Sequence, residues 1–184
     1  MRMMMLLSGS LIAAGCNSEP EVSLENASVE EVTNEVAAAT GGGEVMLQPG
    51  QWQTKVTIED ISIPGMPASA AAQMKGFFAE QRNTAVNYCL TAEEAKRPGG
   101  KVFTGEETKN CRYDRFTMSG GKVEAVMRCE GEGSATMTMT MSGSYKPDSS
   151  TTRSEMEITG GREGSMRIKA LTEARRTGND TEAS

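Results

Sequence analysis

The chain contains no histidine among its 184 residues, and aromatic residues make up only 4% of it. Histidine is the commonest general base in enzymes and the commonest protein ligand of transition metals, so its absence removes the simplest catalytic and metal-binding arrangements. With so few aromatic side chains, a core must be built from aliphatic residues and methionine. The 14 methionines suit that role, because methionine adapts to irregular gaps.

No apolar run is long enough to cross a bilayer as a helix, and the longest near the start is Met3 to Ala14. This run follows Arg2 and has the length of the hydrophobic part of an export signal. Small residues at positions 13–15 then precede Cys16. The pattern resembles a bacterial lipobox, in which the cysteine is acylated and becomes the first residue, although Ala13 stands where leucine is usual.

This segment predicts that residues 1–15 are a lipoprotein signal peptide and that Cys16 carries lipid such as palmitate. An ordinary secretory signal cut near the same place is the alternative, and it also means export. Two or three acyl chains on one cysteine exceed what stable anchoring needs. By resemblance to sorting in enteric bacteria, Asn17 after the cysteine favours the outer membrane. We expect a protein anchored in that bilayer through acylated Cys16 and facing the periplasm.

The negative charge is concentrated near the N-terminus. Residues 17–44 hold seven glutamates, no lysine or arginine, and end in three glycines. Such a segment buries too little apolar surface to offset its ordering entropy, so residues 16–46 are predicted to be an acidic disordered tether, with a short transient helix allowed over Val29–Ala39. The rest is nearly neutral and has no basic stripe interleaved with aromatics, which argues against nucleic acid as a partner.

Beyond the tether, apolar and polar residues alternate in several short runs separated by glycine-rich turns. Alternation with a period of two is typical of half-buried antiparallel strands. It predicts a mainly β domain over residues 47–171, formed by a single antiparallel sheet that is strongly curved or a partial barrel, with one or two short helices. The expected strands include 52–59, 84–90, 134–145, 151–159 and 164–171, the expected helices are 68–83 and 91–98, and residues 172–184 are expected to be a polar disordered tail.

The stretch from Cys111 to Cys129 reads as a hairpin folded about Gly120, with a five-residue loop from Met118 to Lys122. A turn centred there pairs residues whose numbers sum to 240, which places the two cysteines opposite each other. Directly opposed residues have Cβ atoms about 4.5–5.5 Å apart, close to what a disulfide needs. The hairpin therefore predicts a Cys111–Cys129 disulfide, which an oxidising periplasm permits. The other pairs on that face would be Tyr113 with Met127, Arg115 with Ala125 and Thr117 with Val123.

Cys89 is left over from this pairing. With an odd number of cysteines after Cys16, one is a free thiol or pairs between chains, and Cys89 is the candidate. It precedes an expected helix N-terminus, where the dipole would lower the pKa of a thiol and make it reactive. The alternative is that Cys89 is simply a small buried hydrophobic residue.

Several short motifs together resemble the exported bacterial family called domain of unknown function 3617, over about residues 47–171. These are Pro49-Gly50-x-Trp52, Ile63-Pro64-Gly65-Met66-Pro67, Tyr88-Cys89-Leu90-Thr91-x-Glu93-x-Ala95-x-x-Pro98, and the cysteines at 111 and 129. The family has no assigned activity or catalytic residues, so the resemblance implies only a small exported domain with three cysteines. It leaves their pairing open, and a bridge from Cys89 to Cys111 or Cys129 is the rival.

A stripe of methionines at Met137, Met139 and Met141 lies at strand spacing. Thioethers are soft ligands, so the stripe suggests copper(I). The same spacing is what a methionine-built core produces, and same-face neighbours along a strand are about 6.6 Å apart. Both interpretations stay open.

No nucleophile, base and orienting group can be assembled on chemical grounds. Charged pairs such as Asp114 with Arg112 and Glu124 with Lys122 are typical of solvated strand faces. We therefore expect no enzyme, no cofactor and no metal. The expected function is a membrane-tethered periplasmic lipoprotein that binds an apolar small ligand or maintains the envelope. The alternatives are a structural protein that docks another envelope protein, and a thiol-redox or copper-handling protein that uses Cys89 or the methionine stripe.

Overall fold

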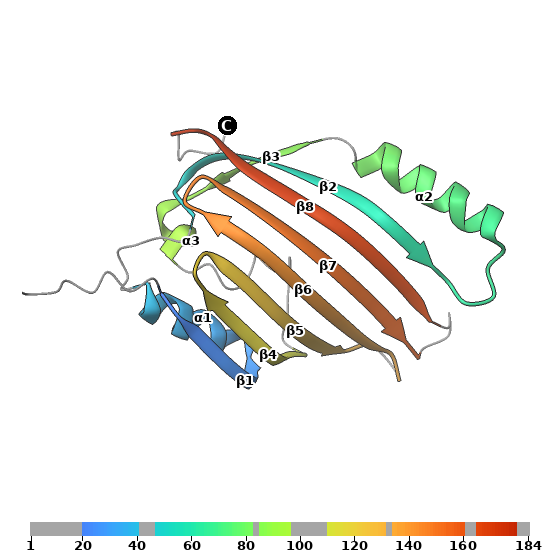
Figure 1. Ribbon diagram of the computed structural model, residues 1–184, viewed down its shortest axis with the longest axis horizontal. Coiled ribbons are helices and arrows are strands. Elements are labelled where there is room, and N and C mark those ends of the chain that lie inside the picture. Colours follow the sequence, from blue (N-terminus) through green and yellow to red (C-terminus); the bar gives the residue numbers. More distant parts are fainter. Residues whose placement is uncertain are drawn as a thin grey trace, which may run out of the picture.

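The computed structural model describes residues 20–40, 47–82, 85–96, 110–131, 134–160 and 165–179. Within these residues eight strands form one sheet, accompanied by three helices (Figure 1). The elements are β1 (Val22–Ser28), α1 (Val29–Ala39), β2 (Gly50–Ser62), α2 (Ala68–Arg82), β3 (Val86–Leu90), α3 (Ala92–Lys96), β4 (Cys111–Ser119), β5 (Lys122–Glu130), β6 (Thr136–Lys146), β7 (Ser149–Thr159) and β8 (Met166–Gly178).

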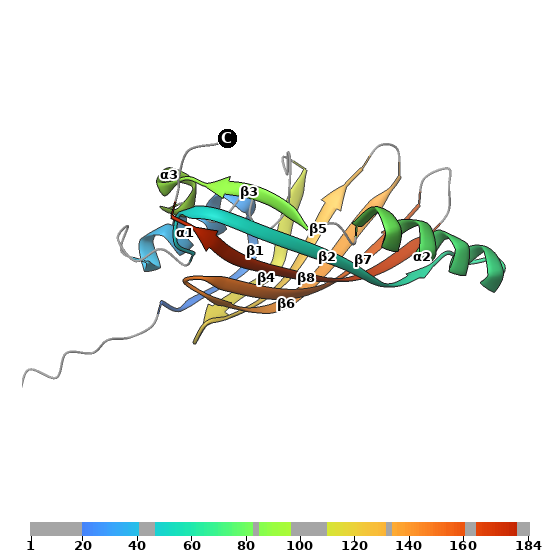
Figure 2. The same cartoon turned by 90° about the horizontal axis from the view of Figure 1, so that it is seen from above.

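The strands lie in the order β1-β4-β5-β6-β7-β8-β2-β3, and every neighbouring pair is antiparallel. The sheet is strongly curved and unclosed, with β1 and β3 at its edges (Figures 1 and 2). The predicted architecture, a single curved antiparallel sheet with short helices, is confirmed. Strands β4 to β8 follow one another in sequence as hairpins, whereas β2 joins the sheet beyond β8.

The two faces of the sheet differ in chemistry. Directly paired residues of antiparallel strands point to the same side, so the register assigns each side chain to a face. We call the inner face the one that carries Trp52, Phe116 and Met118, all fully buried. One buried cluster reaches from Val22 on β1 to Leu90 on β3, the two edge strands. A cluster that joins both edges requires the sheet to bend around its inner face.

The predicted disordered tether is wrong between Val22 and Ala39. Strand β1 pairs with β4, and α1 packs beside both, with Val32 and Val36 only 2% and 1% exposed. The acidic side chains of α1 lie on its exposed side, so the average composition hid an apolar stripe at helical spacing. Residues 16–19 and 41–46 of the predicted tether lie outside the described residues.

Helix α1 begins with a capping box. The Ser28 hydroxyl accepts a hydrogen bond from the Glu31 N–H at 3.1 Å, and the Glu31 carboxylate accepts one from the Ser28 N–H at 2.6 Å. These bonds satisfy two backbone donors that a helix start would leave without partners. They lower the pKa of the Glu31 carboxyl. The box therefore fixes where the chain turns from β1 into α1.

The predicted disordered tail is also wrong over residues 172–178, which continue β8. Thr172 pairs with Val56 of β2 and with Thr152 of β7. Near its end, the Arg176 Nε donates a hydrogen bond to the Pro49 carbonyl at 2.8 Å. The signal peptide, Cys16 and residues 180–184 lie outside the described residues, so the folded unit spans at least residues 22–178.

The predicted hairpin forms, but its register changes part-way. Cys111 pairs with Cys129 and Tyr113 with Met127, as predicted. A β-bulge then inserts Asp114, and from there the pairs sum to 241 instead of 240. Two residues of the expected inner face, Arg115 and Thr117, are therefore placed wrongly by the prediction. The bulge turns the side chains of Phe116 and Met118 inward in their place.

The turn of this hairpin is tighter than the predicted five-residue loop. Ser119 pairs directly with Lys122, which leaves only Gly120 and Gly121 between the strands. Their φ angles are 58° and 68°, as a two-residue turn of type I′ requires. A Cβ at Gly121 would also lie 3.1 Å from the Tyr145 carbonyl oxygen. Glycine at this position is required by both conformation and space.

The helices occupy opposite ends of the sheet. Helices α1 and α3 lie at the end where β2 begins, and α2 lies along the other end of β2 (Figures 1 and 2). There β2 extends past its partner β3, and the Lys75 ammonium donates a hydrogen bond to the Glu59 carbonyl. Helix α2 thus protects a strand edge that β3 leaves uncovered. Both predicted helices exist, and α3 begins with a capping box formed by Thr91 and Glu94.

Candidate ligand-binding face

Six apolar side chains form a regular array on the inner face of β6, β7 and β8. All six are half-buried, and Met137 and Met139 pack against the core. We call this array the methionine–isoleucine patch. It consists of two cross-strand rows, Met137–Ile158–Met166 and Met139–Met156–Ile168.

The second row of the patch is part of a longer apolar row. On one side Met139 pairs with Met127 of β5, and Met127 in turn pairs with Tyr113 of β4. On the other side Ile168 pairs with Ile61 of β2, which is buried. The row crosses six strands, and five steps of about 4.8 Å make it about 24 Å long. The patch is therefore the less buried middle of a continuous apolar strip, not an isolated group.

The outer face of the same strands is polar. Arg167 lies 3.2 Å from the Glu155 carboxylate, Lys169 lies 3.6 Å from it, and Arg153 lies 3.5 Å from Glu59. Each of these ion pairs is exposed and contributes little to stability. Their presence shows which side of the sheet is solvated, and it makes β7, β8 and β2 amphipathic.

Tyr113 stands at the β4 end of the long row and is 1% exposed. Its ring meets Phe116 edge-on, with centroids 5.5 Å apart. Its hydroxyl has no hydrogen-bond partner among the described residues, and burial raises its pKa. A buried polar group without a partner costs about 1–3 kcal/mol. The sequence placed Tyr113 on the inner face but gave it no role; its position in an apolar hairpin face was the available signal.

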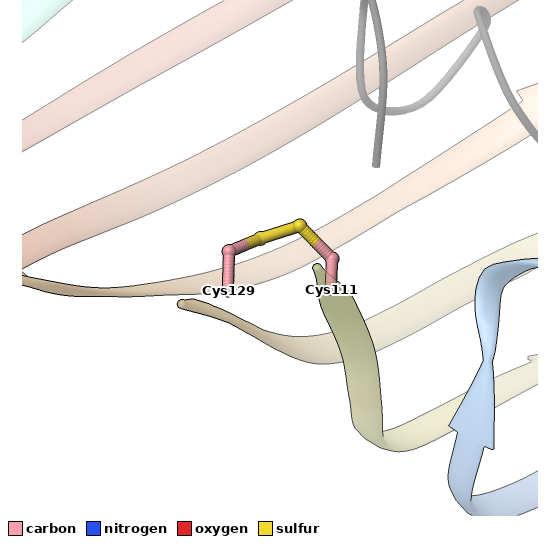
Figure 3. The surroundings of a disulfide bond; sticks show 2 residues. All are labelled: Cys111 and Cys129. Atoms are coloured by element: carbon pink, nitrogen blue, oxygen red, sulfur yellow. A yellow bond between two sulfur atoms is a disulfide. The ribbon is translucent and has the colours of Figure 1, made fainter. Parts of the chain in front are cut away.

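The disulfide between Cys111 and Cys129 is present, with the two Cα atoms 4.0 Å apart (Figure 3). The predicted bridge is confirmed, and the rival pairing with Cys89 is wrong. Cys89 is half-buried on β3, where it pairs with Gln51 of β2. Since Cys129 pairs with Met137, the bridge extends the first row of the patch. A redox role for Cys89 stays a prediction.

The predicted methionine stripe lies along one face of β6, as its spacing indicated. Met141 is buried in the core at 6% exposure, whereas Met137 and Met139 are half-buried. The described part of the chain holds no group of three or more His, Cys, Asp or Glu residues that could bind a metal ion. Copper binding by thioethers is not addressed by that observation and stays a prediction.

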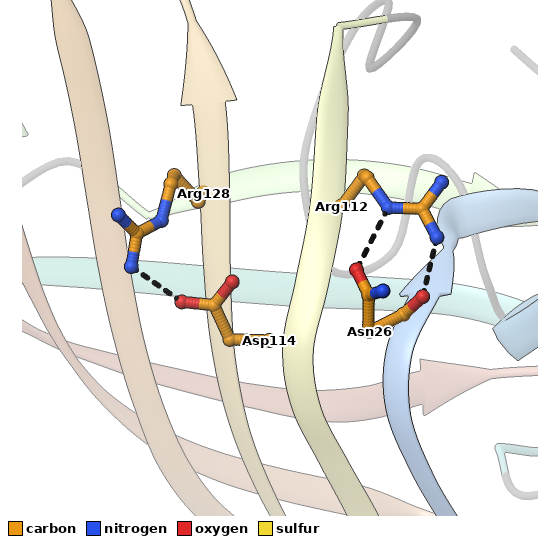
Figure 4. Close-up of polar contacts among 4 residues, drawn as sticks. All are labelled: Asn26, Arg112, Asp114 and Arg128. Carbon is orange, nitrogen blue, oxygen red and sulfur yellow. Dashed lines mark hydrogen bonds and ion pairs between the residues drawn. The ribbon is translucent and has the colours of Figure 1, made fainter.

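The charged residues of the hairpin pair differently from the prediction (Figure 4). Asp114 lies 2.8 Å from Arg128, not beside Arg112. The Arg112 Nε donates to the Asn26 side-chain oxygen at 3.1 Å, and the Arg112 guanidinium also donates to the Asn26 carbonyl. Asn26 has a φ of 48°, and both contacts lie beside the bulge. Arg112 and Asn26 hold β1 onto the bulged strand, whereas Asp114 and Arg128 join β4 to β5. Both contacts are exposed, as expected for a solvated face.

Comparison with protein families assigns most of the chain to one family. A family model described as "Protein of unknown function (DUF3617)" matches residues 47–180. The chain belongs to this family. The DUF3617 region covers strands β2 to β8 and helices α2 and α3. Strand β1 and helix α1 precede it. No curated protein and no solved structure matches the chain. In the described part of this DUF3617 protein, no helix combines the length and apolar character that crossing a membrane requires.

Proposed function

We propose that this DUF3617 protein is a periplasmic lipoprotein, anchored in the outer membrane by acylated Cys16, that binds an apolar ligand on its inner face without catalysing a reaction. The observation that carries the proposal is the methionine–isoleucine patch. Its six side chains are all half-buried, and two of them, Met137 and Met139, pack against the buried core. Apolar surface left in water forgoes about 25 cal/mol per Å², so a ligand that covered the patch would be stabilised there.

The shape and the charge distribution favour a ligand over a flat protein partner. Ligand sites are concave and mostly apolar, with few polar groups, and the patch lies on the side around which the sheet bends. The ion pairs of Arg153, Arg167 and Lys169 all lie on the other face. Methionine is abundant in binding surfaces that adapt to their ligands.

Binding can be tested with the chain from Asn17 to Ser184, which keeps every described strand and helix. The neutral probe N-phenyl-1-naphthylamine should fluoresce on binding. Met139→Gln should weaken the binding of the probe at least tenfold, because it places an amide in the middle of the patch. Thr140→Gln makes the same change on the exposed outer face of β6 and should leave binding unaltered.

If the Met139→Gln variant is folded, as shown by its thermal transition, and binds the probe with unchanged affinity, the proposed site is wrong. Ile158→Gln, in the other row of the patch, provides a second variant if Met139→Gln destabilises the sheet. Absence of binding by the unmodified chain would end the ligand proposal as a whole.

The lipid anchor has its own test. Cells that express the full chain and receive radiolabelled palmitate should label the protein, and Cys16→Ser should abolish the label. Equal labelling of the variant would show that Cys16 is not the acylated residue. Membrane fractionation of the labelled protein should place it with outer-membrane markers rather than inner-membrane markers.

Copper(I) handling is the second candidate, and one observation favours it. Met127, Met139 and Met156 are direct cross-strand neighbours on three consecutive strands. Directly opposed side chains lie about 5 Å apart at Cβ, close enough for flexible thioethers to converge on one soft ion. Competition with the copper(I) chelator bicinchoninate would detect such a site. Failure to withdraw copper(I) from the chelator would exclude it.

A further inference from the structure

We infer that the Tyr113 hydroxyl is the polar anchor of the inner face, and that the ligand is an acyl chain ending in an uncharged carbonyl group, such as an ester. This inference rests on the proposed binding of an apolar ligand. It adds the chemical class of the ligand and the residue that recognises it.

The neighbours of Tyr113 in the sheet are apolar on both sides that the register defines. Tyr113 pairs with Ala27 on β1 and with Met127 on β5, and both are buried. Phe116 closes the third side through the edge-on ring contact. Phenylalanine would fill the same place without the unpaired hydroxyl. The great majority of buried polar groups in proteins are satisfied, so an unpaired donor here favours a partner from outside the described residues.

The position of Tyr113 fits a ligand that lies on the patch. Its ring shares a row with Met139, two strand steps or about 10 Å away. Met127 is the single side chain between them in that row. Because methionine changes conformation readily, Met127 can move aside for a chain that extends from the patch toward the hydroxyl.

The charge of the inner face selects the head group. Among the described residues, none that faces inward from β4, β5, β6 or β7 is charged. Burial keeps the phenol protonated by raising its pKa, so it donates a hydrogen bond. A carboxylate or phosphate buried there would lack a cationic partner, and burying an unpaired charge is very costly. A neutral carbonyl oxygen accepts the bond without that cost.

Three competitors with the same twelve-carbon chain separate the contributions: monolaurin, a neutral ester; laurate, a carboxylate; and dodecane, which has no polar group. Each displaces N-phenyl-1-naphthylamine from the chain Asn17–Ser184. Monolaurin should bind most tightly. Tyr113→Phe should weaken the binding of monolaurin about five- to tenfold, which is the usual contribution of one hydrogen bond. The affinity for dodecane should not change.

Tyr88→Phe is the matched control, since its hydroxyl lies on the same face but bonds to Thr54, and it should not alter monolaurin binding. If monolaurin binds and Tyr113→Phe has no effect, the anchor is wrong while the ligand face stands. If laurate binds as tightly as monolaurin, the uncharged class is wrong. If neither the fluorescent probe nor any competitor binds, the proposed function itself fails.

Discussion

The hydroxyls of Tyr113 and Tyr88 stand in opposite situations on the same face of the sheet. Tyr88 bonds to Thr54, whereas Tyr113 has no partner among the described residues. Removing an unpaired buried hydroxyl should raise the free energy of unfolding, and removing a bonded one should lower it. We expect Tyr113→Phe to gain about 1 kcal/mol and Tyr88→Phe to lose about 1 kcal/mol in urea denaturation of the ligand-free protein. A loss for Tyr113→Phe would indicate a buried water as its partner.

The same two tyrosines make the free energy of unfolding depend on pH in the alkaline range. Burial raises the pKa of both phenols above the ordinary value. Above a pH of about 10 the unfolded chain loses these protons while the folded protein retains them, so unfolding releases protons and the free energy of unfolding falls. This decline should be shallower in Tyr113→Phe, as measured by urea denaturation between about pH 9 and 11.5. An unchanged slope would contradict the desolvation of Tyr113.

At the scale of elements, two glycines offer a matched comparison. Gly121 combines a φ of 68° with a close approach to the Tyr145 carbonyl, whereas Gly76 in α2 has open space around a would-be Cβ. Gly121→Ala should cost about 1–2 kcal/mol, because alanine is strained in the left-handed region. Gly76→Ala should gain up to about 1 kcal/mol from helix propensity. Thermal unfolding would measure both, and a neutral Gly121→Ala would contradict the tight turn.

Much of each strand could be predicted from local alternation. In the expected strands 151–159 and 164–171, Met156, Ile158, Met166 and Ile168 recur with a period of two, and the structure places all four on the inner face. The bulge was missed, although the apolar phase changes between Tyr113 and Phe116. Two apolar residues three apart in a strand are the mark that an inserted residue leaves.

The errors at the N-terminus have a different cause. Seven glutamates dominated the average composition of residues 17–44. The two buried valines of α1, Val32 and Val36, lie four apart, and one apolar stripe is enough for the helix to pack. The full length of the apolar row that contains the ligand patch was beyond local reasoning. Its neighbours depend on β2 pairing with β8, more than a hundred residues along the chain, and no period-two pattern encodes which strands become partners.

At the scale of the whole molecule, the disulfide is the one covalent link within the described sheet. It closes a loop with a sequence separation of 18, for which loop-closure entropy predicts about 3 kcal/mol of stabilisation. The double variant Cys111→Ala, Cys129→Ala should lose that amount in urea denaturation. Cys89→Ala, outside the bridge, should change stability by less than about 1 kcal/mol. Non-reducing peptide mapping that linked Cys111 to Cys89 would overturn the assignment.

If Cys16 is acylated as proposed, the early start of β1 limits how far the domain can travel from the membrane. With Cys16 acylated, only six residue steps separate the lipid from Val22, and even a fully extended chain spans no more than about 20 Å over that distance. A binding face held so close meets bilayer lipids at an effective concentration on the order of millimolar. Under that confinement a weak intrinsic affinity is enough to keep the face occupied, and fast release back to the same bilayer follows from it.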